Sequence, residues 1–203
     1  MSKNNALRPK TSRGELTRQK ILDAAKREIG GRGFAEASIS TITAEAGVGQ
    51  GTFYLYFRTK EDVLRELVLH MGRKLRRHLT MAVGDSPSRI EAERRGLLAF
   101  LEFVRDNPDL YRVVEEAQFV DETIYRQYYD DFAESYRSAL LAAEARGEIR
   151  PGQAEVRAWA LMGIAVMLGH RFAIWEKDAS LPRIAEAAFD MVSHGLIPDD
   201  RRG

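Results

Sequence analysis

Gly-Val-Gly-Gln-Gly-Thr-Phe-Tyr-Leu-Tyr-Phe-Arg-Thr-Lys, residues 47–60, is the stretch that decides the fold of this chain. Just before it, Ile39, Ile42 and Ala46 recur at i, i+3 and i+7, the spacing of one apolar helix face. Gly47 follows, and a glycine just past a helix end takes the left-handed conformation without a steric penalty. We therefore predict a helix, a turn at Gly47 and a second short helix.

The second helix has two different faces. Phe53 and Phe57 are four residues apart, so they share one face, which we assign to the core. The opposite arc of the helix is the candidate DNA-binding surface. This arc contains Gly51, Thr52, Tyr54 and Leu55, with Gln50 and Tyr56 at its edges.

The centre of this arc is suited to the major groove of DNA. Gln50 can form two hydrogen bonds to an adenine edge, and Thr52 or Leu55 can contact a thymine methyl. Gly51 lets the backbone approach the groove.

Its periphery is suited to phosphates. The hydroxyls of Tyr54 and Tyr56 and the ammonium of Lys60 can fix the register on a duplex without reading its sequence. The alternative is an ordinary helical hairpin whose aromatic cluster is only core.

Charge is divided unevenly along the chain. Residues 1–60 contain 11 Lys or Arg and 5 Asp or Glu, a net of +6, whereas residues 61–203 contain 20 and 25, a net of −5. A basic N-terminal part on an acidic remainder is typical of a module that binds a polyanion. A solvated basic face would give the same distribution.

The N-terminal third of the chain also resembles the signature of TetR-type transcriptional repressors. The match is ordered and ungapped over about the first 65 residues. Thr43 departs from it, where the family usually has alanine, and so does Gly49, where a serine that can contact phosphate is frequent. The matching segments are Thr17-Arg-Gln-Lys-Ile-Leu-Asp-Ala-Ala, Gly33-Phe34, Ser38-Ile39, Ala46-Gly-Val, Gly51-Thr-Phe-Tyr, Tyr56-Phe57, Lys60 and Val63-Leu64.

The resemblance implies double-stranded DNA as a partner. It places Thr17 and Arg18 where the first helix of the family approaches the DNA backbone. The expected DNA contacts are Thr17, Ser38, Ser40, Gln50, Gly51, Thr52, Tyr54, Tyr56 and Lys60.

The rest of the chain predicts helices and no strands. Residues 1–14 form a basic arm that enters a minor groove, adds phosphate contacts or is only a solvated tail. Residues 15–60 form the three-helix helix-turn-helix domain, and residues 61–203 a helical bundle for ligand binding and dimerisation. The expected helices, about nine in total, include residues 15–30, 61–83, 89–105, 110–117, 121–146, 154–176 and 182–194.

Composition indicates an intracellular regulator. The chain is 44% hydrophobic and 30% charged, and it has no cysteine. The N-terminus lacks the apolar segment of a signal peptide, and the longest charge-free run, residues 158–170, is too short to span a bilayer. We therefore expect a cytoplasmic protein with no membrane partner and no cofactor.

The last two helices are the expected interface of a homodimer, as the resemblance also implies. The first of them is apolar almost all round, which is typical of a helix buried on several sides. A two-fold dimer would bind a palindromic operator. Burial within one monomer is the alternative. The expected interface residues are Trp159, Gly163, Ile184, Ala188, Met191 and Val192.

Aromatic and methionine side chains in residues 61–203 suit an apolar, aromatic or acyl-chain effector that releases the DNA. Core packing explains the same composition. His170 next to Arg171 is the polar pair that could meet an anionic group. The candidate lining residues are Phe100, Phe103, Tyr111, Phe119, Tyr128, Phe132, Met162, Val166, His170 and Trp175.

Two other classes of protein fit the sequence less well. A helical di-metal enzyme needs Glu-x-x-His pairs, and no histidine here has glutamate three residues before it. Phosphate-binding loops, nucleophile elbows and His-Glu-x-x-His motifs are also missing. An interaction module without DNA binding would leave the Gln50-Gly51-Thr52 surface without a purpose.

Overall fold

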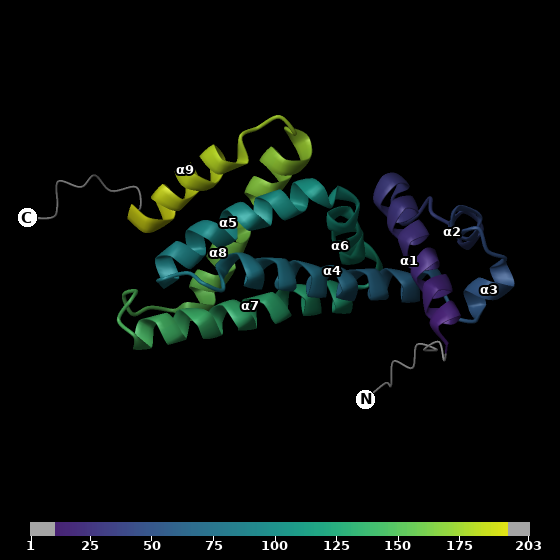
Figure 1. Ribbon diagram of the computed structural model, residues 1–203, viewed down its shortest axis with the longest axis horizontal. Helices are drawn as coiled ribbons and strands as arrows, with labels where there is room; N and C mark the ends of the chain where they lie inside the picture. The colour runs from purple at the N-terminus through teal and green to yellow at the C-terminus, as the bar shows by residue number, and fades with distance from the viewer. Residues whose placement is uncertain (1–10, 195–203) are drawn as a thin grey trace, which may run out of the picture. The chain divides into compact units, whose positions relative to one another are not determined.

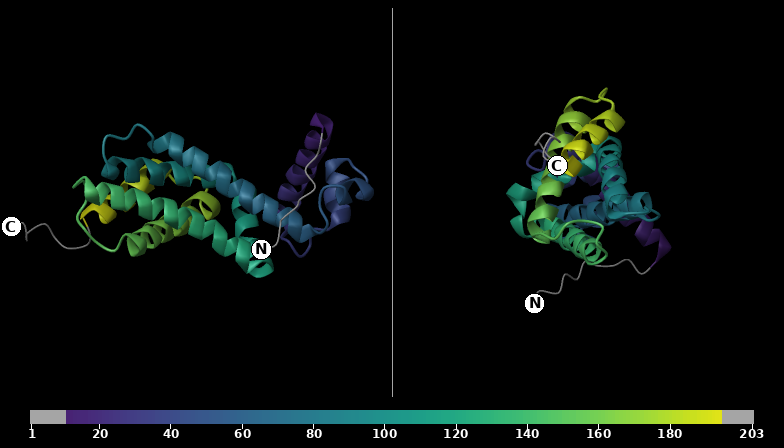
Figure 2. Two further views of the ribbon diagram at one scale, coloured as in Figure 1. Left: turned by 90° about the horizontal axis from the view of Figure 1, so that it is seen from below. Right: turned by 90° about the vertical axis from the view of Figure 1, so that its left-hand side faces the viewer.

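The computed structural model describes residues 11–194, and within this range the chain is built from helices without strands (Figure 1). Nine α-helices and one π-helix occur there, which confirms the all-α prediction. Figure 2 shows these helices from two further directions. Residues 1–10, most of the predicted basic arm, lie outside the described residues.

The chain divides by packing into two compact units. Unit 1 comprises the chain up to residue 73 and residues 107–129, and unit 2 comprises residues 74–106 and the chain from residue 130 onward. The division therefore falls inside two long helices, α4 and α7.

Unit 1 is organised around its first helix. This helix packs against both α2 and α6, and α2 in turn packs against α3. Figure 1 shows α1, α2 and α3 close together. The elements of unit 1 are α1 (Ser12–Arg32), α2 (Ile39–Ala46), α3 (Gln50–Tyr54), α6 (Pro108–Val120) and the first parts of α4 (Lys60–Val83) and α7 (Glu122–Ala145).

The start of α1 differs from the prediction. Thr11 caps the helix, because its Oγ1 accepts a hydrogen bond from the Gly14 amide at 3.2 Å, so α1 begins at Ser12 and not at residue 15. Leu16, an apolar residue in the first turns of α1, is 66% exposed. It lies one turn before Ile21, where the buried stripe begins.

Helices α1 and α6 approach closely at Gly30. A Cβ built on Gly30 would lie 2.6 Å from Cβ and 2.7 Å from Cα of Asp109. The Arg112 side chain donates a hydrogen bond to the Gly30 carbonyl at 3.1 Å. Glycine at this position therefore sets the distance between the two helices.

In unit 2, one helix makes most of the contacts. Helix α5 packs against α8, η1 and α9. The elements are α5 (Arg89–Asp106), α8 (Ala154–Leu168), the π-helix η1 (Gly169–Trp175), α9 (Leu181–His194) and the remaining parts of α4 and α7.

The π-helix is a difference from the single helix predicted over residues 154–176. Gly169 packs against α5, where a Cβ would lie 3.3 Å from Phe100 Cε1. The wider turn leaves carbonyls without their usual partners. Arg105 satisfies one of them, donating to the Phe172 carbonyl at 2.9 Å, and also donates to the Ala179 carbonyl, in the turn before α9, at 2.7 Å.

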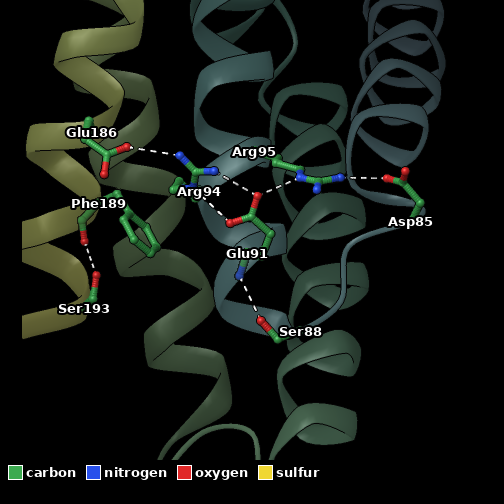
Figure 3. A network of polar contacts seen from close by, with 8 residues as sticks. All are labelled: Asp85, Ser88, Glu91, Arg94, Arg95, Glu186, Phe189 and Ser193. Carbon is green, nitrogen blue, oxygen red and sulfur yellow. Dashed lines mark hydrogen bonds and ion pairs between the residues drawn. The ribbon is translucent and has the colours of Figure 1, made fainter.

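A network of ion pairs joins α5 to its neighbours (Figure 3). Glu91 accepts hydrogen bonds from Arg94 and Arg95, which together lower the pKa of its carboxyl to about 2. Arg95 also pairs with Asp85 at 2.7 Å, and Arg94 with Glu186 of α9 at 3.5 Å. Exposed pairs of this kind contribute little stability each. Only the pair of Arg94 with Glu186 reaches α9.

One stretch of the described chain, Ala154–Trp175, is long and apolar enough to cross a membrane by length and composition, with a mean hydropathy of 1.4. The charge-free run in the sequence did not show this, because a few charged residues at its ends interrupt the apolar segment. Only 17% of the stretch is buried in the structure. It therefore presents an apolar surface that needs an explanation.

The contact between Gly30 and Asp109 predicts that alanine substitutions at the adjacent residues Gly30 and Gly31 have very different effects on stability. Gly30→Ala should destabilise the protein by about 1–3 kcal/mol, because the methyl group meets the α6 backbone. Gly31→Ala should be neutral or stabilising, because nothing lies within 4 Å of its Cβ position. Thermal and urea unfolding of both variants would check this. Equal stabilities would show that α6 does not press on α1 at Gly30.

Candidate nucleic-acid interface

The first helix of the hairpin begins at a complete capping box. The Thr41 amide donates to Ser38 Oγ at 3.0 Å, and the Ser38 amide donates to Thr41 Oγ1 at 3.0 Å. Ser38 therefore has a structural role at the start of α2, and the DNA contact assigned to it stays a prediction. Ser40, two residues later, is exposed. Thr43, the departure from the family pattern, is buried and donates to the Ile39 carbonyl at 2.8 Å.

The turn has the predicted geometry. Gly47 is left-handed, with φ 66° and ψ 36°. The Gly47 amide donates to the Ala44 carbonyl and the Val48 amide donates to the Thr43 carbonyl, which together form a Schellman motif. These bonds satisfy the end of α2 and redirect the chain into α3.

The inner side of this segment is formed by Phe53 of α3 and by Phe57, which lies three residues after the helix ends. Phe53 is 0% and Phe57 3% exposed, and their ring centroids are 5.7 Å apart. The Tyr54 ring meets the edge of Phe53 at 5.6 Å. This confirms the core assignment of Phe53 and Phe57.

The outer face of α3 is the predicted arc. Gln50 and Gly51 are exposed, Tyr54 is 51% exposed and Leu55 63%. Thr52 and Tyr56 are half-buried at its edges. The surface thus offers an amide side chain, two phenol hydroxyls, a threonine and an uncovered stretch of backbone. These groups can form hydrogen bonds with base edges and phosphates.

Neither glycine of this surface is required by internal packing. Cβ atoms built on Gly49 and Gly51 would meet nothing within 4 Å, and neither residue has a positive φ. Gly49 leaves α3 without a side-chain cap. Because no side chain projects at these two positions, another molecule can come close to the backbone there.

Lys60 has an internal role that the sequence did not predict. Its Nζ donates to the carbonyls of Phe34 and Ala37, both at 2.5 Å, and lies 4.1 Å from the centre of the Phe34 ring. The side chain is half-buried. Two of its three protons are thus used inside unit 1, and the phosphate contact assigned to Lys60 stays a prediction.

Helix α1 contributes less to the surface than the resemblance implied. The side chain of Arg18 is only 13% exposed and pairs with Glu66 at 3.3 Å, so it supports α4 instead of facing solvent. Thr17 is half-buried, and its hydroxyl donates to the Arg13 carbonyl at 3.0 Å. Arg58, which was not selected, is exposed and forms no ion pair within the described chain. The sequence could have indicated Arg58 as a candidate contact, because it lies inside residues 47–60.

The predicted effector residues do not form one group. Tyr111 and Tyr128 are buried in unit 1, where burial and then the Glu115 charge raise the pKa of Tyr111. Phe103 is buried in unit 2, 5.3 Å from the His78 ring. Half-buried positions of unit 2 are Phe100, Phe132, Met162, Val166 and His170.

Two of these residues are largely exposed. Phe119 is 85% exposed near the end of α6, and Trp175 is 67% exposed at the end of η1. Neither lines the interior of its unit, because each is at a helix end where the chain turns toward solvent. His170 lies 6.1 Å from the Trp175 ring, and Arg171 pairs with Glu176 instead of completing an anion site with His170.

The fold and this surface define a helix-turn-helix protein whose chain continues into a helical bundle. Residues 21–67 match the model of the bacterial regulatory proteins of the tetR family. The chain is 34% identical over 108 residues to YdgC of Bacillus subtilis, an uncharacterised helix-turn-helix transcriptional regulator; the match spans 50% of this chain and 54% of the relative. The likeness to tetR-family regulators is thus shown for the N-terminal part of the chain, which spans about half the length of this relative.

Solved structures show the same fold over nearly the whole chain. FadR from Bacillus subtilis in complex with stearoyl-CoA has a TM-score of 0.76 at 19% identity, covering 89% of this chain and all of that one. AibR in complex with isovaleryl coenzyme A and operator DNA has a TM-score of 0.71 at 19% identity, covering 86% and 97%. The first of these proteins is a transcriptional regulator, and the second was solved bound to operator DNA.

Gly51→Ala should change stability and DNA affinity in opposite directions. Replacing a helical glycine should stabilise the protein by about 0.5–1 kcal/mol, because the methyl group has free space. If the groove lies against this backbone, the variant should nevertheless lose about tenfold or more in affinity for a specific duplex. Fluorescence anisotropy with a selected duplex would measure this, with Gly31→Ala as the control for a remote glycine. Unchanged affinity would place the groove elsewhere.

Proposed function

We propose that the protein is a ligand-responsive transcriptional regulator of the cytoplasm, which binds a palindromic operator as a homodimer and is released by a small effector. The observation that carries this proposal is the two-sided α3. Phe53 and Phe57 are fully buried, while Gln50 and Gly51 are exposed beside them.

DNA recognition would follow from that face. Gln50 and Thr52 would contact base edges, and Gly51 would allow the backbone to come close. Tyr54, Tyr56, Ser40 and Arg58 would contact phosphates and fix the register. The basic balance of residues 1–60 would add sequence-independent attraction.

Dimerisation would cover the apolar surface of α8 and α9. Val156 is 60% exposed, Trp159 42%, Met167 62% and Met191 39%. So many large apolar side chains rarely stay in water on neighbouring helices. Gly163 is also exposed, with free space at its Cβ position, so a second helix can come close there.

A second copy of the chain is the natural partner for this surface. Ile184, Ala188 and Val192 of α9 are half-buried and would become fully buried against it. The same contact explains why Ala154–Trp175 is apolar without a membrane. A two-fold dimer then presents two α3 helices to successive major grooves, which predicts a palindromic operator.

The effector that we propose is an acyl thioester or another molecule with an acyl chain. FadR and AibR, which share the fold, were solved with stearoyl-CoA and isovaleryl coenzyme A. In unit 2, Phe100, Phe132, Met162 and Val166 keep part of their surface uncovered, as apolar lining residues of a ligand site would.

Release would require a mechanical link to the DNA-binding helices, and α6 provides one. Its close contact with α1 at Gly30 leaves no space for independent movement, and Arg112 joins the two helices by a hydrogen bond. Arg65 of α4 also binds Asp121, at the junction of α6 and α7. A coupling of about 1–3 kcal/mol through such contacts weakens DNA binding roughly 5- to 150-fold.

DNA binding is tested by selecting genomic duplexes on the purified protein. A palindromic sequence should be enriched. Gln50→Ala and Thr52→Ala should reduce the ratio of specific to non-specific affinity by about 1–3 kcal/mol, because base contacts carry the sequence information. Stearoyl- and isovaleryl-CoA should then be titrated into the complex. A protein that binds heparin as well as any duplex is not a sequence-specific regulator.

Dimerisation is tested by light scattering. The wild-type chain should have twice the mass of a monomer, and Trp159→Glu should shift it toward monomer, because a carboxylate would be buried in an apolar contact. Arg126→Glu, at an exposed site of α7, is the control for a changed surface charge. A monomeric wild type at micromolar concentration would remove the basis for a palindromic site.

A further inference from the structure

Unit 1 contains a turn that is bound from both sides by charged side chains. Helix α1 ends at Arg32, and residues 33–38 connect it to α2. Gly33 has a φ of 87°, a conformation that favours glycine. The turn ends at Ser38, the cap of α2, so its position determines where α2 begins.

One charged partner comes from α6. The Phe34 amide donates to Glu116 Oε2 at 3.0 Å, across 82 positions of sequence. A Cβ on Gly33 would lie 3.2 Å from the other carboxylate oxygen, so glycine also gives Glu116 its access to the turn. Phe34 is only 9% exposed, and its amide therefore needs a protein partner.

The other partner comes from α4. Lys60 Nζ donates to the Phe34 and Ala37 carbonyls and lies against the Phe34 ring. The N–H and the C=O of the same residue are thus bound by groups of opposite charge from two different helices. Bonds to ionised groups are stronger than those between neutral groups, so this turn is held firmly in one position.

The consequence reaches the recognition helix. The capping box of Ser38 and Thr41 fixes the first turn of α2, and the Schellman motif at Gly47 joins α2 to α3. A displacement of the turn would therefore change the direction of α2 and, with it, the arc of α3 that carries Gln50.

We infer that Glu116 is a positioning residue for DNA recognition, which acts through the backbone of Phe34. The inference rests on the proposed function and deepens it. Glu116 connects α6 to the start of α2 directly, in addition to the packing of α6 on α1. Movement of α6 would therefore act on the orientation of the hairpin and not only on the position of α1.

The test compares Glu116→Ala with Glu116→Gln, which keeps an acceptor oxygen of nearly the same reach. Gln118→Ala, on the exposed side of the same helix, is the control. Glu116→Ala should weaken specific duplex binding about tenfold, with non-specific binding nearly unchanged, because the hairpin keeps its charge but loses its alignment. Glu116→Gln should restore most of the specific affinity. Circular dichroism melts would confirm that each variant is folded at the temperature of measurement.

Hydrogen exchange gives a readout that does not need DNA. Glu116→Ala should speed exchange of the Phe34 amide about tenfold and also that of Thr41 in the capping box. Unchanged exchange at both amides would overturn the inference, as would an equal loss of specific and non-specific binding. If the wild type selects no duplex, the proposed function fails, and the exchange rates still decide whether Glu116 holds the turn.

Discussion

The burial of Phe53 and Phe57 is the interaction on which the candidate interface depends. Helix α3 spans only Gln50–Tyr54, far too short to be stable by itself in water. Each buried ring contributes roughly 2–3 kcal/mol of apolar burial. Because the two rings fix one face of α3 inward, they also determine that the opposite face meets solvent. The surface proposed for DNA recognition therefore depends on the apolar contact behind it.

Helix α1 is the common support of unit 1. One of its sides packs on α2, and its end packs on α6 at Gly30, where the two backbones nearly touch. The turn that follows is bound by Glu116 and Lys60. Interior packing of this kind transmits displacement, since it leaves little free volume to absorb it. The hairpin and α6 are in this way parts of one rigid arrangement within unit 1.

Unit 2 poses a different physical problem, because much of its apolar surface is not buried. Its interior is closed by α5, which contacts η1 at Gly169 and through Arg105, and α9 through the pair of Arg94 with Glu186. Helix α8 nevertheless leaves Val156, Met167 and part of Trp159 in water. Such a surface is unfavourable for an isolated chain, and this is the reason for the proposal that two copies of the chain associate there.

The sequence alone determined the all-helical class, the turn at Gly47 and the two faces of α3. These features depend on local rules: a helical period, a glycine with positive φ, and two aromatic rings four residues apart. Only the tertiary structure decided the roles of residues whose partners are distant in the chain. Lys60 and Arg18 resembled phosphate ligands, and only the structure showed that Lys60 also binds the Phe34 carbonyl and that Arg18 pairs with Glu66. Glu116 gave no signal, because its partner amide lies 82 positions away. The exposure of Phe119 and Trp175 could not be predicted for the same reason. The sequence shows that a side chain is apolar, but only the tertiary packing decides whether another element covers it.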